Sequence, residues 1–249
     1  MLPEFFRLQG SVAMVTGAGN PMAKAIGEAF AEAGADVVAV SHRAEAAQAL
    51  AVSVRDYGRE SLAVTADMSL AADVRRVTGE ALGRFGKIDI LLTGEEAIFA
   101  APVGDLEEEQ WDTLMSVNAK SVYLCAQTVG KEMLIKGQGR IIVLAHGLGL
   151  VGVPNTTAYS ASQGAVLQFT KSLGVEWAAT GVTVNAIATG WFEGTWETPG
   201  GDPLAHFIPM RRRGKPEELG PVAVYLASNA AKYVTASTYI VDGGQICHA

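Results

Sequence analysis

The chain of 249 residues has little cysteine and no cysteine pattern that would bind a metal ion. Cys125 falls within a helical pattern and Cys247 lies near the end, and neither belongs to a Cys-x-x-Cys or Cys/His spacing. One cysteine pair does not make a disulfide framework either. We therefore expect no metal and no disulfide-stabilised fold.

The sequence is also poor in positive charge and in long apolar runs. It has 19 Lys and Arg against 26 Asp and Glu, for a net charge of −7, and its one basic run, Arg211–Arg213, is short. This balance argues against nucleic acid or an anionic membrane as the main partner. No apolar run reaches membrane-spanning length, and Met1–Gly10 does not resemble a signal peptide. We expect a cytoplasmic protein.

Short apolar runs alternate with longer helical patterns along the chain. The runs are Val12–Thr16, Val37–Val40, Leu62–Thr65, Ile88–Leu92, Arg140–Ala145, Val182–Ala188 and Tyr239–Val241. The helical patterns are Lys24–Ala33, Ala44–Tyr57, Ala71–Phe85, Glu107–Lys136, Tyr159–Ala179 and Pro216–Ser228. Strands that are apolar on both faces are typical of a parallel sheet covered by helices. The sequence predicts one α/β domain over 1–249, a doubly wound, parallel, seven-stranded Rossmann-like sheet with helices on both faces.

One irregular segment stands out, because it is rich in Gly, Pro and aromatic residues and directly follows a predicted strand. It covers 189–209, and the lid that it predicts extends over 189–215. Ligands of doubly wound sheets bind outside the carboxyl ends of the strands. Long loops in compact domains are usually functional, so we expect a substrate lid here. The alternative is a flap that covers the edge of the sheet.

Six short motifs occur in a recognisable order and spacing. They are Thr16-Gly17, Ala66-Asp67, Val117-Asn118-Ala119, Tyr159, Val184-Asn185-Ala186 and Val241-Asp242-Gly243-Gly244. With them the chain resembles the short-chain dehydrogenase/reductase family over nearly its whole length. The resemblance implies a nicotinamide dinucleotide cofactor, a catalytic Tyr159 and a helix Asn118 that orders a water. An equally good interpretation is that Asn118 holds a kink in a long helix. It also implies a homotetramer that pairs two long helices, here 107–136 and 159–179.

The family's tyrosine is followed four positions later by a lysine, and here that position is Gln163. In the family the lysine holds the nicotinamide ribose, and its charge lowers the pKa of the tyrosine. A neutral amide can still bond a ribose hydroxyl, but it cannot stabilise a phenolate. We therefore expect the pKa of Tyr159 to lie near the free value of about 10.

The family's catalytic serine lies thirteen positions before the tyrosine, and His146 stands there in this chain. An imidazole is larger than a hydroxyl, and it can donate, accept or carry charge near neutral pH. One interpretation is a catalytic histidine that faces Tyr159 from the end of a strand. The other is a structural histidine.

The phosphate-binding turn is altered as well. Gly17 and Gly19 are kept, whereas Pro21 and Ala23 replace two family glycines, although proline is accepted at a helix start. The segment after Gly94 reads Glu95-Glu96, where the family lies against the adenosine ribose. Two acids there would repel a pyrophosphate by roughly 1 kcal/mol or more, unless their side chains turn to solvent.

Further residues are compatible either with ligand binding or with a purely structural role. No acid is present near Ser41 for a ribose diol, so Ser41 and Arg43 favour the 2′-phosphate of NADP, or form a plain polar loop. Gly94 and Asp67 complete the predicted cofactor residues. The aromatic residues Trp191, Phe192 and Trp196 are predicted to wall a substrate pocket, to fill vacated nicotinamide space, or to pack as core.

Three hypotheses follow, because the core pattern is intact and the departures from the family gather at one cleft. In the first, redox chemistry is lost, and Tyr159 with His146 performs acid–base chemistry on a small oxygenated substrate. In the second, the protein is an NAD(P)-dependent oxidoreductase with an unusual Tyr-His-Gln site. In the third, it is a non-catalytic partner. The first is the main prediction, and NADP or NAD is expected to bind weakly if at all.

Overall fold

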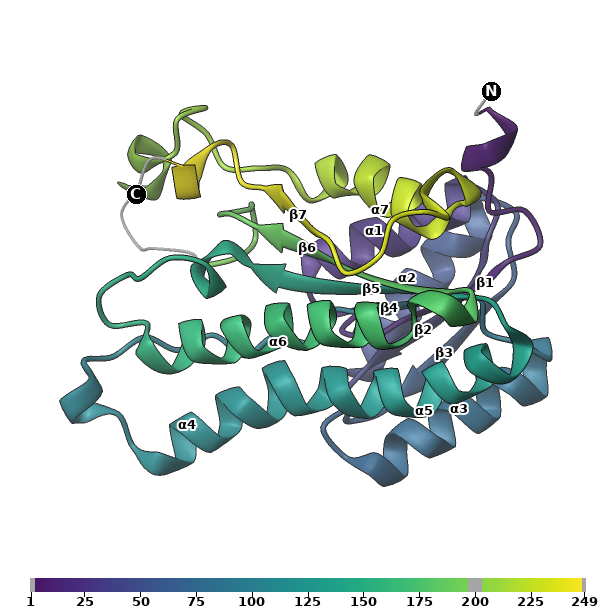
Figure 1. Ribbon diagram of the computed structural model, residues 1–249, viewed down its shortest axis with the longest axis horizontal. Coiled ribbons are helices and arrows are strands. Elements are labelled where there is room, and N and C mark those ends of the chain that lie inside the picture. The colour runs from purple at the N-terminus through teal and green to yellow at the C-terminus, as the bar shows by residue number, and fades with distance from the viewer. Residues whose placement is uncertain (1–2, 197–202, 248–249) are drawn as a thin grey trace.

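The computed structural model describes residues 3–196 and 203–247, and its centre is a parallel sheet (Figure 1). The strands are β1 (Val12–Val15), β2 (Asp36–Ser41), β3 (Ser61–Thr65), β4 (Ile90–Thr93), β5 (Gly139–His146), β6 (Val182–Thr189) and β7 (Thr238–Val241). Their order in the sheet is β3-β2-β1-β4-β5-β6-β7, and every neighbouring pair is parallel. This confirms the predicted doubly wound sheet.

Helices cover both faces of the sheet, as Figure 1 shows. The helices α1 (Pro21–Glu32), α2 (Ala44–Asp56) and α7 (Gly220–Ala227) pack on one face. The other face carries α3 (Ala71–Phe85), α5 (Ser121–Lys136), which follows the short α4 (Glu108–Leu114), and α6 (Thr157–Glu176). Every residue of β1, β4 and β6 is buried. Two covered faces explain why these strands do not alternate between polar and apolar residues.

Helix α1 shows how the sequence sets the entry to the site. Met22, Ile26 and Phe30 recur every four residues and are buried against the sheet. The side chain of Asn20 accepts a hydrogen bond from the Met22 N–H and so caps the helix. Pro21 occupies the first helical position, where no intrahelical bond is lost. The proline is therefore compatible with the turn that it follows.

The strand order reverses between β1 and β4, which are neighbours in the sheet although they are not consecutive in the sequence. The connections that leave them run to opposite sides, and this opens a crevice at their carboxyl ends. Gly17, after β1, has φ of +68°, and a Cβ there would lie 2.2 Å from the carbonyl carbon of Gly94, after β4. The two loops touch so closely that only glycine fits at position 17.

The helical pattern predicted over 107–136 is interrupted in its middle. Residues Met115–Lys120, between α4 and α5, form a π-helical segment. Asn118 lies in it, and its Oδ1 accepts from the N–H of Ala97 at 2.7 Å while its Nδ2 donates to Ser162 Oγ at 3.0 Å. Asn118 therefore joins the loop after β4 to α6, and the irregular turn positions its side chain to do so.

The predicted lid at 189–215 follows β6, and its residues 197–202 lie outside the described part of the chain. The part up to Trp196 is held by Arg213, whose guanidinium donates to the carbonyl oxygens of Phe192 at 3.3 Å and of Trp196 at 3.1 Å. Among the described residues, no helix combines the length and apolar character that a membrane span requires.

Candidate active site

A cleft of about 450 Å³ opens where β1, β2 and β4 end. It is lined by Gly17, Gly19, Asn20, Pro21, Ser41, His42, Arg43, Gly94, Glu95, Glu96, Ile98, Val117, Gly194, Thr195 and Trp196. All of the predicted cofactor residues except Asp67 are in this lining. The structure thus brings the altered turn after β1, the polar residues after β2 and the acidic segment after β4 to one place.

Glu95 points into the phosphate-binding turn and not to solvent. Its Oε1 accepts from the backbone N–H of Gly17 at 2.8 Å, and its Oε2 accepts from the hydroxyl of Thr16. Burial raises the pKa of the Glu95 carboxyl to about 7, against the opposing effect of these hydrogen bonds. A substantial fraction of Glu95 is therefore neutral near pH 7, which reduces the repulsion expected from an acid at this position.

Arg43 lies over the turn from the opposite side of the cleft. Its guanidinium donates to the carbonyl oxygen of Gly19 at 3.3 Å, and its backbone N–H donates to Ser41 Oγ at 3.2 Å. A Cβ on Gly19 would lie 2.8 Å from the Arg43 guanidinium. The absence of a side chain at position 19 is what lets this cation approach the backbone.

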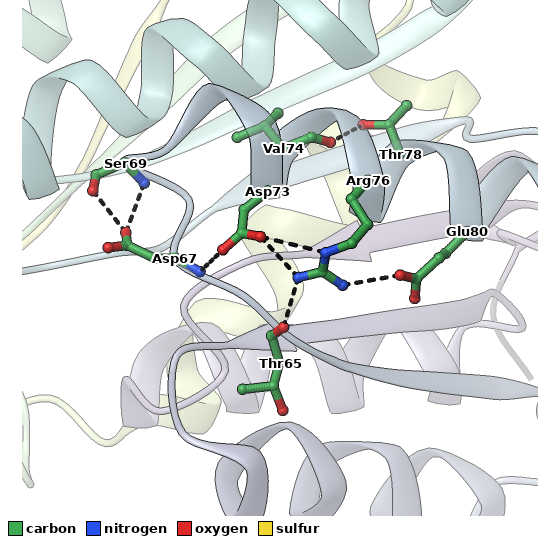
Figure 2. A network of polar contacts seen from close by, with 8 residues as sticks. All are labelled: Thr65, Asp67, Ser69, Asp73, Val74, Arg76, Thr78 and Glu80. Carbon is green, nitrogen blue, oxygen red and sulfur yellow. Dashed lines mark hydrogen bonds and ion pairs between the residues drawn. The ribbon is translucent and has the colours of Figure 1, made fainter.

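Asp67 has a different setting from the other predicted cofactor residues (Figure 2). Its Oδ1 accepts from the N–H and the hydroxyl of Ser69, at 2.9 and 2.7 Å. Its own N–H donates to Asp73, which in turn pairs with Arg76, and Arg76 also reaches the carbonyl oxygen of Thr65. This network orders the loop after β3 and the start of α3, outside the lining of the cleft.

Tyr159 is buried at the start of α6, and its hydroxyl donates to Oε1 of Glu96 at 2.5 Å. The Oε2 of Glu96 accepts from Asn20 Nδ2 at 3.3 Å. Burial raises the pKa of both groups, and the nearby Glu96 carboxylate raises that of Tyr159 further, to well above its ordinary value. The expectation that Tyr159 has an ordinary pKa is therefore wrong, because the phenol is buried and lies against the Glu96 carboxylate.

His146 ends β5 beside Tyr159, with the two ring centroids 5.7 Å apart. Its Nδ1 accepts from the N–H of Leu148 at 3.0 Å, so in the neutral ring the proton is on Nε2. Burial lowers the pKa of His146 to about 4, which keeps the ring neutral at pH 7. Nε2 is buried and has no hydrogen-bond partner among the described residues. It is an N–H donor ready for an incoming oxygen atom.

Gln163 lies one helical turn after Tyr159, and it is buried. Its Oε1 accepts from the backbone N–H of His146 at 2.9 Å. The sequence left the amide of Gln163 able to bond a ribose hydroxyl, and in the structure its oxygen is bonded to the end of β5. Gln163 thus sets the position of His146 relative to Tyr159.

Aromatic rings close the other side of this pair. Trp191 lies 4.8 Å from His146, Trp196 lies 5.6 Å from Tyr159, and the two indoles are 5.0 Å apart, all between ring centroids. Trp196 holds φ of +47°, an unusual value for a residue with a side chain. Phe192 is instead buried in the main core with α1 and α7. Two of the three predicted aromatic residues therefore contact His146 and Tyr159.

Comparison with known proteins now decides the family. The family model described as enoyl-(acyl carrier protein) reductase matches residues 17–245. D-threitol dehydrogenase of Mycolicibacterium smegmatis is 36% identical over 244 residues, 96% of this chain and 94% of that protein. The chain belongs to the short-chain dehydrogenase/reductase family.

Solved structures of other members of the short-chain dehydrogenase/reductase family match the whole fold. A short-chain alcohol dehydrogenase from Sinorhizobium meliloti has a TM-score of 0.94 at 33% identity, with 98% of this chain and 100% of that one covered. A gluconate 5-dehydrogenase from Burkholderia cenocepacia, in complex with NADP and tartrate, has a TM-score of 0.92 at 33% identity, with 99% of each chain covered.

These relatives overturn the main functional prediction made from the sequence. That prediction was non-redox acid–base chemistry in a family member that has lost its redox activity. The similar proteins are named as dehydrogenases and reductases, and they favour the alternative, an NAD(P)-dependent oxidoreductase. The overturned prediction depended mainly on Gln163, which stands where the family has lysine.

The residues of this family member fit a nicotinamide dinucleotide. The cleft is polar at the turn after β1, where the backbone of Gly17 and Gly19 meets the start of α1, and Arg43 and Ser41 line its far end. Helix starts favour anionic phosphate groups. Outside this lining, the ring of His146, with its unpartnered Nε2, adjoins Tyr159, and the Tyr159 hydroxyl contacts Glu96 in the lining.

Sequence reasoning did not find two residues of this site in their actual roles. Glu96 was considered only as a charge near phosphate, whereas it binds the Tyr159 hydroxyl. Asn20, which joins Glu96 to the turn, was not singled out. An acid at a glycine position of the family was the available signal for Glu96. Within 3–196 and 203–247 no cluster of His, Cys, Asp and Glu could hold a metal ion.

Proposed function

We propose that this chain is an NAD(P)-dependent oxidoreductase that interconverts a secondary hydroxyl group and a carbonyl group on a small polyol or hydroxy acid. The observation that carries the proposal is that the ring of Tyr159 adjoins His146, whose Nε2–H has no partner among the described residues, and that the Tyr159 hydroxyl reaches Glu96 in the lining of the cleft. The substrate class comes from the similar proteins, which are named for threitol and gluconate.

In this proposal the nicotinamide, when bound, accepts or supplies the hydride. His146 donates its Nε2–H to the substrate oxygen, in place of the serine hydroxyl that the family uses. The neutral ring can do this without a change of protonation, because its pKa of about 4 lies far below neutral pH. Gln163 holds the backbone of His146 so that this N–H stays next to Tyr159.

Tyr159 exchanges the proton of the same substrate oxygen through its hydroxyl. Trp191 and Trp196 wall the spot and exclude water from it, and their faces suit the C–H surface of a carbon chain that carries hydroxyl groups. The site in this proposal is therefore an atypical Tyr-His-Gln set supported by a carboxylate.

NADP is the cofactor that we propose in preference to NAD. Arg43 lies at the end of the cleft that follows β2, next to Ser41, and no acid follows that strand to bind a ribose diol. A guanidinium at this position suits a 2′-phosphate. The earlier expectation of weak dinucleotide binding remains a prediction, and Glu95 in its charged form is the group that would weaken it.

The test combines binding with turnover. Thermal unfolding of the wild-type protein should shift upward with NADP⁺ or NADPH, since a ligand that binds only the folded state stabilises it. Formation of NADPH should then be followed with threitol, glycerol and gluconate as substrates. Tyr159→Phe should abolish turnover and keep the thermal shift. Absence of both the shift and turnover in the wild-type protein would overturn the proposal.

A further inference from the structure

Glu96 binds the hydroxyl group on which the proposed chemistry depends. Its Oε1 lies 2.5 Å from the Tyr159 oxygen, and its Oε2 accepts from Asn20 Nδ2 at 3.3 Å. Glu96 also lines the cleft, so one carboxylate connects the buried tyrosine to the phosphate-binding turn.

During oxidation of an alcohol the substrate must lose a proton, and Tyr159 cannot keep it as a neutral phenol. The phenol already holds its own proton at neutral pH, because burial and Glu96 keep the pKa of Tyr159 well above its ordinary value. Two neighbouring acceptors are already used: Gln163 Oε1 binds the His146 N–H, and His146 Nδ1 binds the Leu148 N–H. The Glu96 carboxylate is the acceptor in direct contact with the phenol.

We propose that Glu96 is a catalytic residue that receives the Tyr159 proton when the substrate hydroxyl is oxidised, and returns it when the carbonyl is reduced. The inference rests on the proposed oxidoreductase function. It assigns to a carboxylate the task of making the tyrosine reactive, which in the family belongs to the lysine found where this chain has Gln163.

The proposed oxidation accounts for each proton and each electron pair that the substrate loses. The substrate O–H bond breaks and its proton binds the Tyr159 oxygen, while the original Tyr159 proton moves to Oε1 of Glu96. A bound oxidised nicotinamide would supply the oxidant, by taking up the electron pair of the substrate C–H bond as a hydride. The carbon–oxygen bond becomes a carbonyl, and Glu96 ends as a neutral carboxylic acid.

Glu96 can release this proton to water, because its side chain is only partly buried and lines the cleft. The titratable or charged groups around it are Tyr159 from α6 and Glu95 on its own segment, with His42 and Arg43 further along the cleft. Asn20 and Trp196, which also line it, carry no charge. Desolvation raises the pKa of the Glu96 carboxyl above its ordinary value.

The decisive variants are Glu96→Gln, which keeps the shape and cannot take a proton, and Glu96→Asp, which stays ionisable. We expect Glu96→Gln to lower kcat for alcohol oxidation by about 100-fold, within the range of general acid–base catalysis. Glu96→Asp should retain more of the rate. Glu28→Gln is the matched control, since Glu28 also accepts from a hydroxyl, that of Ser53 at 2.6 Å, outside this cleft.

A second measurement needs neither cofactor nor turnover. The tyrosinate absorbance of the ligand-free protein is titrated with base, and the signal of Tyr159 is assigned by its loss in Tyr159→Phe. Removal of the negative charge in Glu96→Gln should lower the midpoint of this signal relative to the wild-type protein. Glu28→Gln should leave it unchanged.

The outcomes separate this inference from the proposed function. If the wild-type protein oxidises an alcohol and Glu96→Gln keeps or raises kcat, Glu96 is not the proton acceptor and the inference is wrong. If no variant and no wild-type sample turns over, the proposed function is wrong, and the tyrosinate titration alone decides. An unchanged Tyr159 midpoint in Glu96→Gln then contradicts the inference, whereas a lowered midpoint supports the proton coupling.

Discussion

Glu95 puts an ionisable group directly against the turn that would hold the cofactor phosphates. Its pKa of about 7 means that the carboxyl is mostly neutral at pH 6 and mostly charged at pH 8. The charged form repels a pyrophosphate, so the affinity for NADP⁺ should fall as the pH rises through 7. A penalty of about 1 kcal/mol corresponds to roughly fivefold weaker binding.

The measurement is the dissociation constant of NADP⁺ at pH 6 and pH 8, for the wild-type protein and for Glu95→Gln. The variant has no charge to lose or gain at this position, so most of the pH dependence should disappear. Equal pH dependence in both proteins would show that Glu95 does not face the phosphates.

His146 and Gln163 join the two elements on which they lie, β5 and α6. The Gln163 side chain joins α6 to the end of β5 through one buried hydrogen bond. Gln163→Ala leaves the His146 N–H buried without a partner, which should lower the free energy of unfolding by about 1–3 kcal/mol. Chemical denaturation checks this value. Gln127→Ala, at an exposed position of α5, is the control, and an equal loss in both variants would contradict the account.

At the level of elements, the side chain of Arg213 holds the described part of the lid up to Trp196, together with backbone hydrogen bonds between Trp191, Glu193 and Gly214. Arg213 donates to the carbonyl oxygens of Phe192, Thr195 and Trp196, whereas its neighbour Arg212 forms a surface ion pair with Glu218. We expect Arg213→Met to lower kcat/KM by about tenfold or more through loss of Trp196 from the site. Arg212→Met should change it little, because exposed ion pairs contribute little.

Hydrogen exchange gives a second view of the same prediction. The amides after β6 up to Trp196 should exchange faster in Arg213→Met than in Arg212→Met. If the two variants exchange alike and are equally active, Arg213 does not hold the lid closed.

The helices and strands were predictable from the sequence where short local patterns, such as apolar runs and capping residues, determine them. Apolar runs gave the strands of the sheet because both faces are covered, and the capping Gly86 marks the end of α3. The π-helical segment Met115–Lys120 was not predictable, because it follows no period that differs visibly from that of a helix. It depends on Asn118, whose partners lie in the loop after β4 and on α6.

The candidate site was predictable in its location but not in its contacts. The motifs placed Tyr159, His146 and the glycine turn at one edge of the sheet, and the structure brings them there. The bond between Tyr159 and Glu96 spans 63 positions, and only the folded crevice brings the two together. Without that contact, Gln163 looked like the loss of a catalytic group.

At the scale of the whole molecule we predict a homotetramer that pairs the α4–α5 and α6 helices. Ile135 is 83% exposed and Val175 is 70% exposed, and Tyr123 and Phe169 form an edge-to-face pair across α5 and α6. We expect this exposed apolar area to be covered by a second copy of the chain. Light scattering at micromolar concentration should give four times the 26.1 kDa chain mass. Val175→Lys should shift the mass downward, and a monomeric wild-type protein would refute the prediction.

The central claim for the whole molecule is redox chemistry on a dinucleotide in the cleft between β1 and β4. The most direct measurement is the absorbance of NADPH formed by purified wild-type protein with NADP⁺ and a panel of small polyols and hydroxy acids. We predict sustained formation with at least one of them, which stops in Tyr159→Phe. No NADPH or NADH formation with any substrate, at a dinucleotide concentration that saturates the thermal shift, would contradict the claim.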